Sequence, residues 1–280
     1  MNGSSAITPC FTEPSKEAVM PLVPTDPTSA VVLGPFVAAA FDQFNSHQDE
    51  LNPATIPLPA GYTLVRNIQM SDILGGAGTP RFFGYLAAGP TMQVVALRGT
   101  DTLTEWFDDV QWDLVPFTPV ANGGNVAQGF FDIYTTMTTM TPGNAATTPG
   151  IAGFTAAVDP AVPLVVTGHS LGGPLTTMLV ADLTANSALK PQAWSFASPK
   201  VGDAAFAARY GALSTVSWRF YNTVDLATHI PFGEDYEHVN TGYGLNSLTY
   251  AKWSVGCAHA LNTYLHGLDP SIALDPGCVP

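Results

Sequence analysis

The segment from Pro163 to Asn186 constrains the fold of this chain more than any other stretch. Pro163–Thr167 is short, apolar and rich in β-branched residues, Gly168–Gly172 reads Gly-His-Ser-Leu-Gly, and Pro174–Asn186 has a helical composition. A strand that enters a helix through a Gly-x-Ser-x-Gly turn needs small residues for close packing and leaves the serine at the tip. The segment therefore predicts a strand, a sharp turn with Ser170 at its tip, and a helix.

Apolar spacing and residue type predict the elements on either side of this segment. Apolar residues three to four positions apart predict a helix over Ser29–His47. Aromatic and β-branched runs indicate strands, and stretches rich in Pro, Gly and polar residues indicate loops. By these criteria 62–98, 193–198 and 216–222 contain strands, 129–137 is helical, 141–150 is a loop, and about 1–28 is an irregular arm.

The alternation of strands and helices predicts the class of fold. Strands joined through helices build a mainly parallel sheet with helices on both faces. The chain has 280 residues, of which 46% are hydrophobic and 11% charged, so it can bury a large core and is not disordered. No repeat or linker divides it. We expect an α/β fold in a single domain, 1–280, that begins with the irregular arm.

Charge and hydropathy argue against nucleic-acid binding and against a transmembrane segment. The formal net charge is −13, whereas nucleic-acid binding needs a basic surface. No uninterrupted apolar run approaches the ~18–20 residues that span a bilayer. We therefore expect neither a nucleic-acid partner nor a transmembrane segment.

Three cysteines limit the covalent and metal chemistry. Cys10, Cys257 and Cys278 allow at most one disulfide, and they lack the paired spacing of a zinc site. A bridge that ties the two ends of the chain is sterically sensible, but the spacing leaves the pairing open.

Ser170 is the candidate nucleophile. The helix that follows it places the backbone N–H of Leu171 where it can stabilise an oxyanion. The competing interpretation is an ordinary strand-to-helix turn. The apolar strand before the motif and the helix after it favour the catalytic interpretation.

A serine nucleophile needs a base and a carboxylate that orients the base. In folds with this turn, an acid and then a histidine follow the serine along the chain. Asp225 follows the predicted strand 216–222, whereas the rival Asp203 precedes it. We expect Asp225 to be the acid.

Four histidines follow the serine. His229 lies four residues after Asp225, and His238 lies where a further strand begins, which is more typical of structural histidines. His259 and His266 flank ALNTYL on one predicted helix and, seven residues apart, share a similar face. A catalytic imidazole is best placed on the loop or the helix start above the sheet. This favours His259, with His266 as the alternative.

Further motifs, in their order along the chain, resemble those of the class 3 (fungal-type) lipases. Besides GHSLGG, these motifs are LRGTDTLTEWFDDV, VAQGFFDIY, SFASPKVGDAAFA, RFYNTVDLATHIP, YEHVNTG and HALNTYLH. They cover about residues 62–267, and their order is hard to reconcile with coincidence. The resemblance implies the α/β-hydrolase fold with a short lid segment.

The resemblance also implies roles for single residues, and it implies neither a metal nor a cofactor. It implies a Ser170–His259–Asp225 triad. The implied oxyanion hole consists of Thr100 and Leu171. The residues implied for the lid and for substrate binding are Trp106, Phe107 and His169. The alternative for the segment around Trp106 is an amphipathic surface turn.

These features predict a carboxylic ester hydrolase, and the resemblance implies a triacylglycerol lipase acting at an oil–water interface. A feruloyl or short-chain carboxylesterase on the same scaffold is the main alternative, because apolar aromatic walls also bind aromatic acids. A non-catalytic lipase-like interaction protein would lack a triad or oxyanion residue, and none is missing here.

The expected location is extracellular. Few lysines, many threonines and a possible disulfide favour secretion. The N-terminus shows no recognisable secretory signal, so a cytoplasmic location is the alternative. The oligomeric state stays open.

Overall fold

The computed structural model describes residues 22–71, 78–100, 110–214 and 216–280. Within these residues nine strands form one sheet in the order β11-β10-β9-β8-β3-β2-β1-β6-β7, and β4 and β5 pair apart from it. The strands are β1 (Thr63–Ser71), β2 (Pro80–Ala88), β3 (Gln93–Leu97), β4 (Leu114–Pro116), β5 (Asn125–Ala127), β6 (Thr138–Met140), β7 (Thr147–Pro149), β8 (Leu164–His169), β9 (Gln192–Phe196), β10 (Ser217–Asn222) and β11 (Thr241–Leu245).

Helices connect and cover these strands. The α-helices are α1 (Gly34–Ser46), α3 (Gln128–Thr135), α4 (Gly150–Ala157), α5 (Gly172–Asn186), α6 (Ala204–Leu213), α7 (Val255–His259) and α8 (Leu261–Leu268). The 3₁₀ helices are η1 (Thr28–Leu33), η3 (Leu226–His229), η4 (Ser247–Thr249) and η5 (Pro276–Cys278). In the described part of the chain, no helix has the length and apolar character needed to cross a membrane.

The half of the sheet from β3 to β11 is parallel. β3, β8, β9, β10 and β11 pair in parallel, and α5 and α6 provide the crossovers from β8 to β9 and from β9 to β10. Parallel neighbours need such crossovers. The predicted parallel, helix-covered sheet is confirmed here. In the other half β2, β1, β6 and β7 continue the sheet as antiparallel strands.

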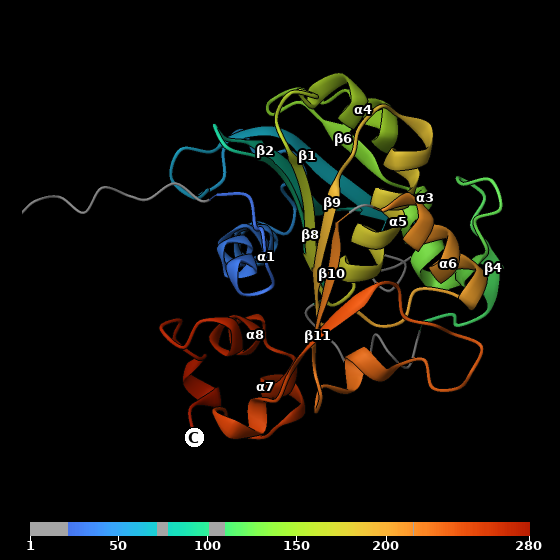
Figure 1. Ribbon diagram of the computed structural model, residues 1–280. Coiled ribbons are helices and arrows are strands. Elements are labelled where there is room, and N and C mark those ends of the chain that lie inside the picture. Colours follow the sequence, from blue (N-terminus) through green and yellow to red (C-terminus); the bar gives the residue numbers. More distant parts are fainter. Residues whose placement is uncertain (1–21, 72–77, 101–109, 215) are drawn as a thin grey trace, which may run out of the picture.

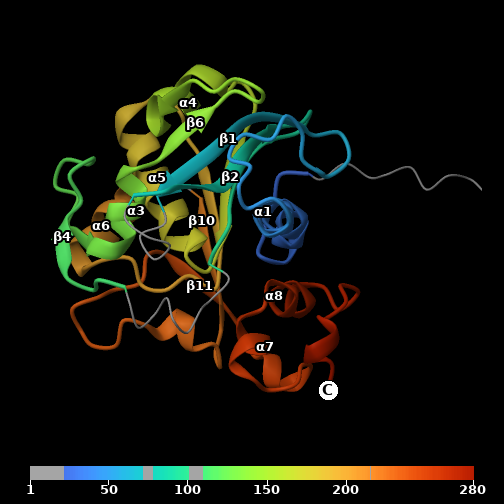
Figure 2. The same ribbon diagram turned by 180° about the vertical axis from the view of Figure 1, so that it is seen from behind.

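Each face of the sheet has its own core. Figures 1 and 2 show α1 and α8 on one face and α3 to α6 on the other. Phe36, Trp194 and Tyr264 lie in the first core, and Phe130 and Leu179 lie in the second. The α5 helix is buried from Gly172 to Leu183, because it packs on the sheet and other helices cover it. The helix that follows Ser170 is therefore firmly fixed.

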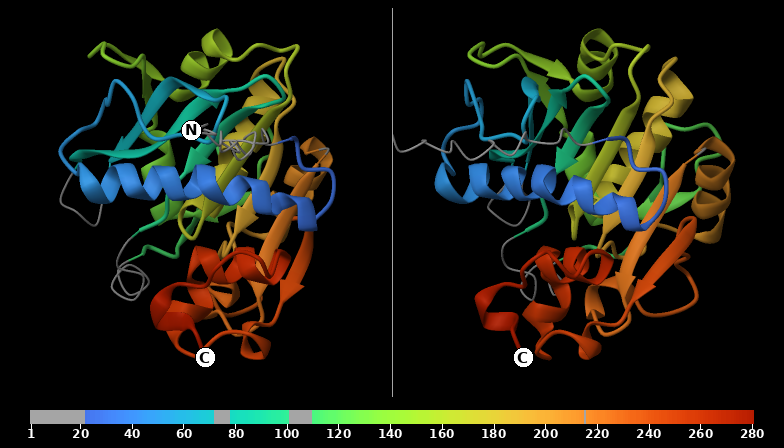
Figure 3. Two further views of the ribbon diagram at one scale, coloured as in Figure 1. Left: turned by 90° about the vertical axis from the view of Figure 1, so that its left-hand side faces the viewer. Right: turned by 60° about the vertical axis from the view of Figure 1, so that its left-hand side comes forward.

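The C-terminal elements lie together at one end of the molecule. Figure 3 shows α1 across one face of the sheet and, below it, α7 and α8 with the end of the chain. In open α/β sheets, ligands bind beyond the carboxyl ends of the parallel strands. His169 ends β8 and Asn222 ends β10, so the segments after these two strands are where a site is expected.

Three local predictions differ from the structure. The predicted loop 141–150 contains the edge strand β7, whose two threonines favour extended backbone and whose Pro149 lacks an N–H. The predicted helix Ser29–His47 begins as the 3₁₀ helix η1 and becomes α-helical at Gly34. The predicted single helix around His259 and His266 is two helices, because Ala260 adopts extended backbone with ψ of 135°.

The disulfide also differs from the bridge considered from the sequence, which would have tied the two ends of the chain together. Cys257 is bonded to Cys278, 21 residues further on, so neither sulfur is available to Cys10, which lies outside the described residues. Cys257 lies in α7 and Cys278 ends η5. The bond therefore ties the helix that ends at His259 to the last turn of the chain.

Loss of this disulfide is expected to destabilise the fold. The Cys257→Ser/Cys278→Ser double variant should lose about 3 kcal/mol of unfolding free energy, because a closed loop of this length restricts the unfolded chain by about that amount. Urea unfolding followed by circular dichroism measures the loss. The Cys10→Ser variant is the control and should keep the parent midpoint. An unchanged midpoint in the double variant would contradict the prediction.

Candidate active site

Ser170 lies at the tip of a strained turn between β8 and α5. Its φ is 57°, in the left-handed region that few residues other than glycine adopt. Two backbone bonds hold this conformation: Ser170 N donates to Phe196 O at 3.0 Å, and Gly173 N donates to Ser170 O at 2.8 Å. Such a strained strand-to-helix turn is typical of a nucleophile held at the tip between a strand and a helix. The predicted strand, turn and helix are therefore present.

Two glycines permit this close packing. A Cβ on Gly168 would lie 2.3 Å from the carbonyl oxygen of Gly172, so strand and helix could not approach as they do. A Cβ on Gly99 would lie 2.8 Å from the Cβ of Ser170. Gly99 therefore brings the segment after β3 against the serine, and the half-buried Thr100 is the next residue.

Asp225 and His259 are in contact. His259 Nδ1 lies 2.8 Å from Asp225 Oδ2, and the two residues are 7% and 1% exposed, respectively. Asp225 is the N-cap of η3, and its Oδ1 accepts from Ala227 N at 3.0 Å. His259 is the last residue of α7. The structure thus brings together the acid and base favoured by the sequence.

Two residues that the sequence analysis did not single out complete this contact. Tyr264 Oη donates to Asp225 Oδ2 at 2.6 Å, the same oxygen that His259 binds, and accepts from Asn222 N at 3.1 Å. Asn222 Nδ2 donates to Ala258 O at 2.8 Å, next to His259. Burial, and then the nearby Asp225, raise the pKa of Tyr264 well above its usual value, so its hydroxyl keeps the proton that it donates. The one sequence feature that could have indicated this contact is that Tyr264 lies five residues after His259.

Three buried atoms in this region, Ser170 Oγ, His259 Nε2 and His169 Nδ1, have no hydrogen-bond partner among the described residues. All three are inaccessible to solvent. A buried polar atom without a partner costs about 1–3 kcal/mol, so such atoms need an explanation. Catalytic hydrogen bonds are often long in the absence of substrate and shorten when it binds.

His169 contacts His259 and is 5% exposed. Its Nε2 donates to the backbone oxygen of His259 at 2.7 Å, and the two ring centroids lie 4.7 Å apart. Burial, and then the neighbouring His259 ring, lower the pKa of His169 to about 3. His169 is therefore neutral at physiological pH and holds the backbone of the residue expected to be the base. Of the lid and substrate-binding prediction, Trp106 and Phe107 lie outside the described residues.

The rival acid and bases make other contacts. Asp203 caps α6, accepting from Phe206 N at 2.8 Å, and accepts from both nitrogens of Asn125. The rival histidines each place a ring nitrogen on a backbone carbonyl: His229 on Thr223, His238 on Thr228 and His266 on Ile272. Among the described residues, none of these four side chains forms a hydrogen bond with Asp225.

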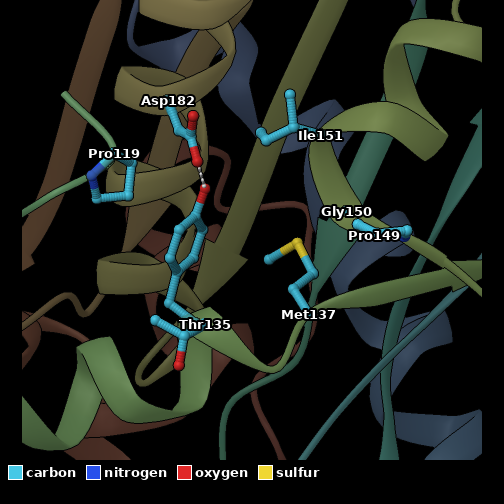
Figure 4. Close-up of a pocket in the computed structure, with 8 residues that line it drawn as sticks. Pro119, Thr135, Met137, Pro149, Gly150, Ile151 and Asp182 are labelled. Atoms are coloured by element: carbon cyan, nitrogen blue, oxygen red, sulfur yellow. Dashed lines mark hydrogen bonds between the residues drawn. The ribbon is translucent and has the colours of Figure 1, made fainter.

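A cavity of about 280 Å³ lies away from these residues, and Asp182, near the end of α5, is among the residues that line it (Figure 4). Tyr134 Oη and Asn186 Nδ2 each donate to the Asp182 carboxylate at 2.7 Å, and Tyr134 and Asp182 line the cavity. Asp182 is twelve positions after Ser170, about 18 Å along a helix. No residue predicted for the site lines this cavity. Among the described residues, no group of three or more His, Cys, Asp or Glu could hold a metal ion.

Comparison with known proteins gives one family. The lipase (class 3) family matches residues 94–234. Phospholipase A1-II 3 from Oryza sativa subsp. japonica is 30% identical over 227 residues, covering 69% of this chain and 54% of that protein. Secreted mono- and diacylglycerol lipase A from Penicillium cyclopium is 35% identical over 92 residues, covering 32% of this chain and 30% of that protein. The chain spans about half the length of the plant relatives that it matches.

Solved structures agree on the fold. The crystal structure of a mutant form of MDLA from Penicillium cyclopium superposes with a TM-score of 0.58 at 22% identity, covering 76% of this chain and 77% of that one. Lipase II from Rhizopus niveus superposes with a TM-score of 0.58 at 17% identity, covering 78% and 82%. The predicted α/β-hydrolase fold is confirmed, and the chain belongs to the class 3 lipase family.

Proposed function

We propose that this protein hydrolyses carboxylic esters through an acyl-enzyme, with Ser170, His259 and Asp225 as its triad. One observation carries the proposal. His259 Nδ1 bonds to Asp225, and the two atoms that must exchange a proton, Ser170 Oγ and His259 Nε2, are both buried without a hydrogen-bond partner among the described residues. A proton on Nδ1 leaves the lone pair on Nε2 free to accept from the serine.

The reaction follows from this arrangement. His259 Nε2 takes the hydroxyl proton as Ser170 Oγ attacks the ester carbonyl carbon, and Asp225 stabilises the imidazolium that forms. The tetrahedral intermediate collapses, and His259 donates the proton to the departing alcohol. A water molecule, deprotonated by His259, then attacks the acyl-serine, and the acid is released with Ser170 restored.

The oxyanion hole is assigned to Thr100 and Leu171. Leu171 precedes α5, whose first turn carries N–H groups without acceptors inside the helix. Thr100 follows Gly99, which packs against Ser170. Donors from two separate segments can converge on the developing oxyanion and stabilise its charge.

The proposed substrates are lipid esters, with triacylglycerols at an oil–water interface as the first candidate. Phospholipid esters are the second candidate, because the relatives that cover most of this chain are named phospholipases A1. The extracellular location is part of the proposal, supported by the disulfide and by the similarity to a secreted fungal lipase.

A substrate panel tests the proposal. Rates are measured on emulsified long-chain triacylglycerol, phosphatidylcholine, a soluble short-chain ester and a ferulate ester, with the Ser170→Ala variant as blank. We expect turnover of the two lipid substrates to exceed that of the ferulate ester. Turnover confined to the soluble ester would replace lipase with carboxylesterase. Turnover confined to the ferulate would replace it with feruloyl esterase, and no turnover above the blank would overturn ester hydrolysis.

A further inference from the structure

Large apolar side chains remain exposed near the C-terminal end of the chain. Leu248 is 53% exposed, Trp253 66%, Val255 44% and Val279 55%. We call these four residues the C-terminal apolar patch. Single exposed apolar residues are ordinary, but several gathered on one segment indicate a contact surface.

Backbone bonds and the disulfide hold the segments of the patch together. Lys252 N donates to Cys278 O at 2.9 Å, which joins the residue before Trp253 to the residue before Val279. Ala251 N donates to Ser247 O at 2.7 Å, next to Leu248. The Cys257–Cys278 bond closes the same unit, and Figures 1 and 2 show α7 beside the end of the chain. The segments that carry the four side chains are therefore held together.

The patch adjoins the acid and base of the proposed triad. Val255 begins α7 and His259 ends it, so the two lie one helical turn apart on a similar face. Two further exposed side chains lie near Asp225 in the sequence: Leu226, 55% exposed, and Phe232, 75% exposed. Leu226 belongs to η3, which contacts α7. Apolar surface thus lies beside the site itself.

The charge around the patch decides what it can bind. From 246 to 259, Lys252 is the only Lys, Arg, Asp or Glu, so little charge is desolvated when the surface is covered. The whole chain carries a net charge of −13, which opposes an anionic surface. A tryptophan has an apolar body and one N–H, which suits the boundary between acyl chains and headgroups.

We propose that the C-terminal apolar patch docks this protein onto a lipid surface whose headgroups are uncharged or zwitterionic. This inference rests on the proposed function and assigns the surface contact to the segment that carries His259, rather than to the segment around Trp106. Docking there brings the acid and base to the lipid boundary, where ester carbonyls lie.

Vesicle binding tests the inference without any turnover. The full chain carrying Ser170→Ala is sedimented with phosphatidylcholine vesicles and with vesicles that also contain phosphatidylglycerol. Trp253→Ala and Leu248→Ser, each added to this background, should lower the partition coefficient about tenfold, since each removes an apolar side chain from the contact. Leu22→Ser is the matched control, because Leu22 is 64% exposed outside the patch, and it should bind like its parent. Phosphatidylglycerol should weaken binding by the parent.

A second measurement does not depend on a destabilising substitution. Brominated phosphatidylcholine should quench the tryptophan fluorescence of the Ser170→Ala protein, and Trp253→Phe should remove most of that quenching while binding is retained. Unchanged binding in Trp253→Ala and Leu248→Ser would overturn the inference, as would binding lost in Trp106→Ala alone, tighter binding to the anionic vesicles, or self-association that occupies the patch. If these variants bind as expected but the wild-type protein hydrolyses no ester, only the proposed function fails.

Discussion

The Ser170→Ala variant is expected to lose ester hydrolysis almost completely while its fold becomes slightly more stable. Without the nucleophile no acyl-enzyme forms, and loss of a catalytic serine lowers kcat about 10⁶-fold. The hydroxyl of Ser170 is buried without a partner among the described residues, so its removal relieves a desolvation cost of about 1 kcal/mol. Alanine keeps the Cβ, and the two backbone bonds that hold the turn do not involve the hydroxyl.

The measurement pairs a soluble short-chain ester assay with urea unfolding. Thr176→Val is the matched control, because Thr176, on α5, carries another buried hydroxyl without a partner among the described residues. It should gain similar stability and keep its turnover. Turnover by Ser170→Ala within tenfold of the wild-type value would remove Ser170 from the nucleophile role. A large loss of stability would mean that the hydroxyl supports the turn.

The turn around Ser170 and most of the parallel sheet could be predicted from the sequence. The strand, glycines and helix around Ser170 are contiguous, so their spacing alone predicts a turn that the structure contains with φ of 57°. Asp225 could be favoured over Asp203 because order along the chain is a topological property of the fold. The helix break at Ala260 and the short strand β7 lack a periodic signal, and the expectations for them were wrong.

Contacts between segments far apart in the sequence could not be predicted from local patterns. Tyr264 meets Asp225 across 39 residues, and no local pattern reports which polar group a buried hydroxyl will reach. Pairing of Cys257 with Cys278 depends on η5 folding back onto α7, which cysteine spacing does not encode. The C-terminal apolar patch was equally hidden, because Trp253 and Val279 become neighbours only through that fold.

The Asp225→Asn variant is expected to lower kcat about 10³–10⁴-fold, since the carboxylate fixes which nitrogen of His259 carries the proton. An amide cannot reproduce the contacts of Asp225 in either orientation. If the amide oxygen points toward His259 and Tyr264, the NH₂ group faces the N–H of Ala227, so two donors meet. In the wild-type protein this N–H donates to Asp225 Oδ1. With the amide reversed, its NH₂ donates to His259 Nδ1, and Nε2 then carries the proton and cannot accept one from Ser170.

Two further variants separate orientation of the base from general loss of structure. Asp203→Asn is the matched control, because asparagine also caps a helix, and its kcat should stay within about threefold of the wild-type value. Tyr264→Phe removes one donor from Asp225 but leaves the bond to His259, so kcat should fall about tenfold with KM unchanged. Steady-state kinetics on the soluble ester measure all three variants. If Asp225→Asn lowers kcat no more than Tyr264→Phe does, Asp225 does not set the tautomer of His259.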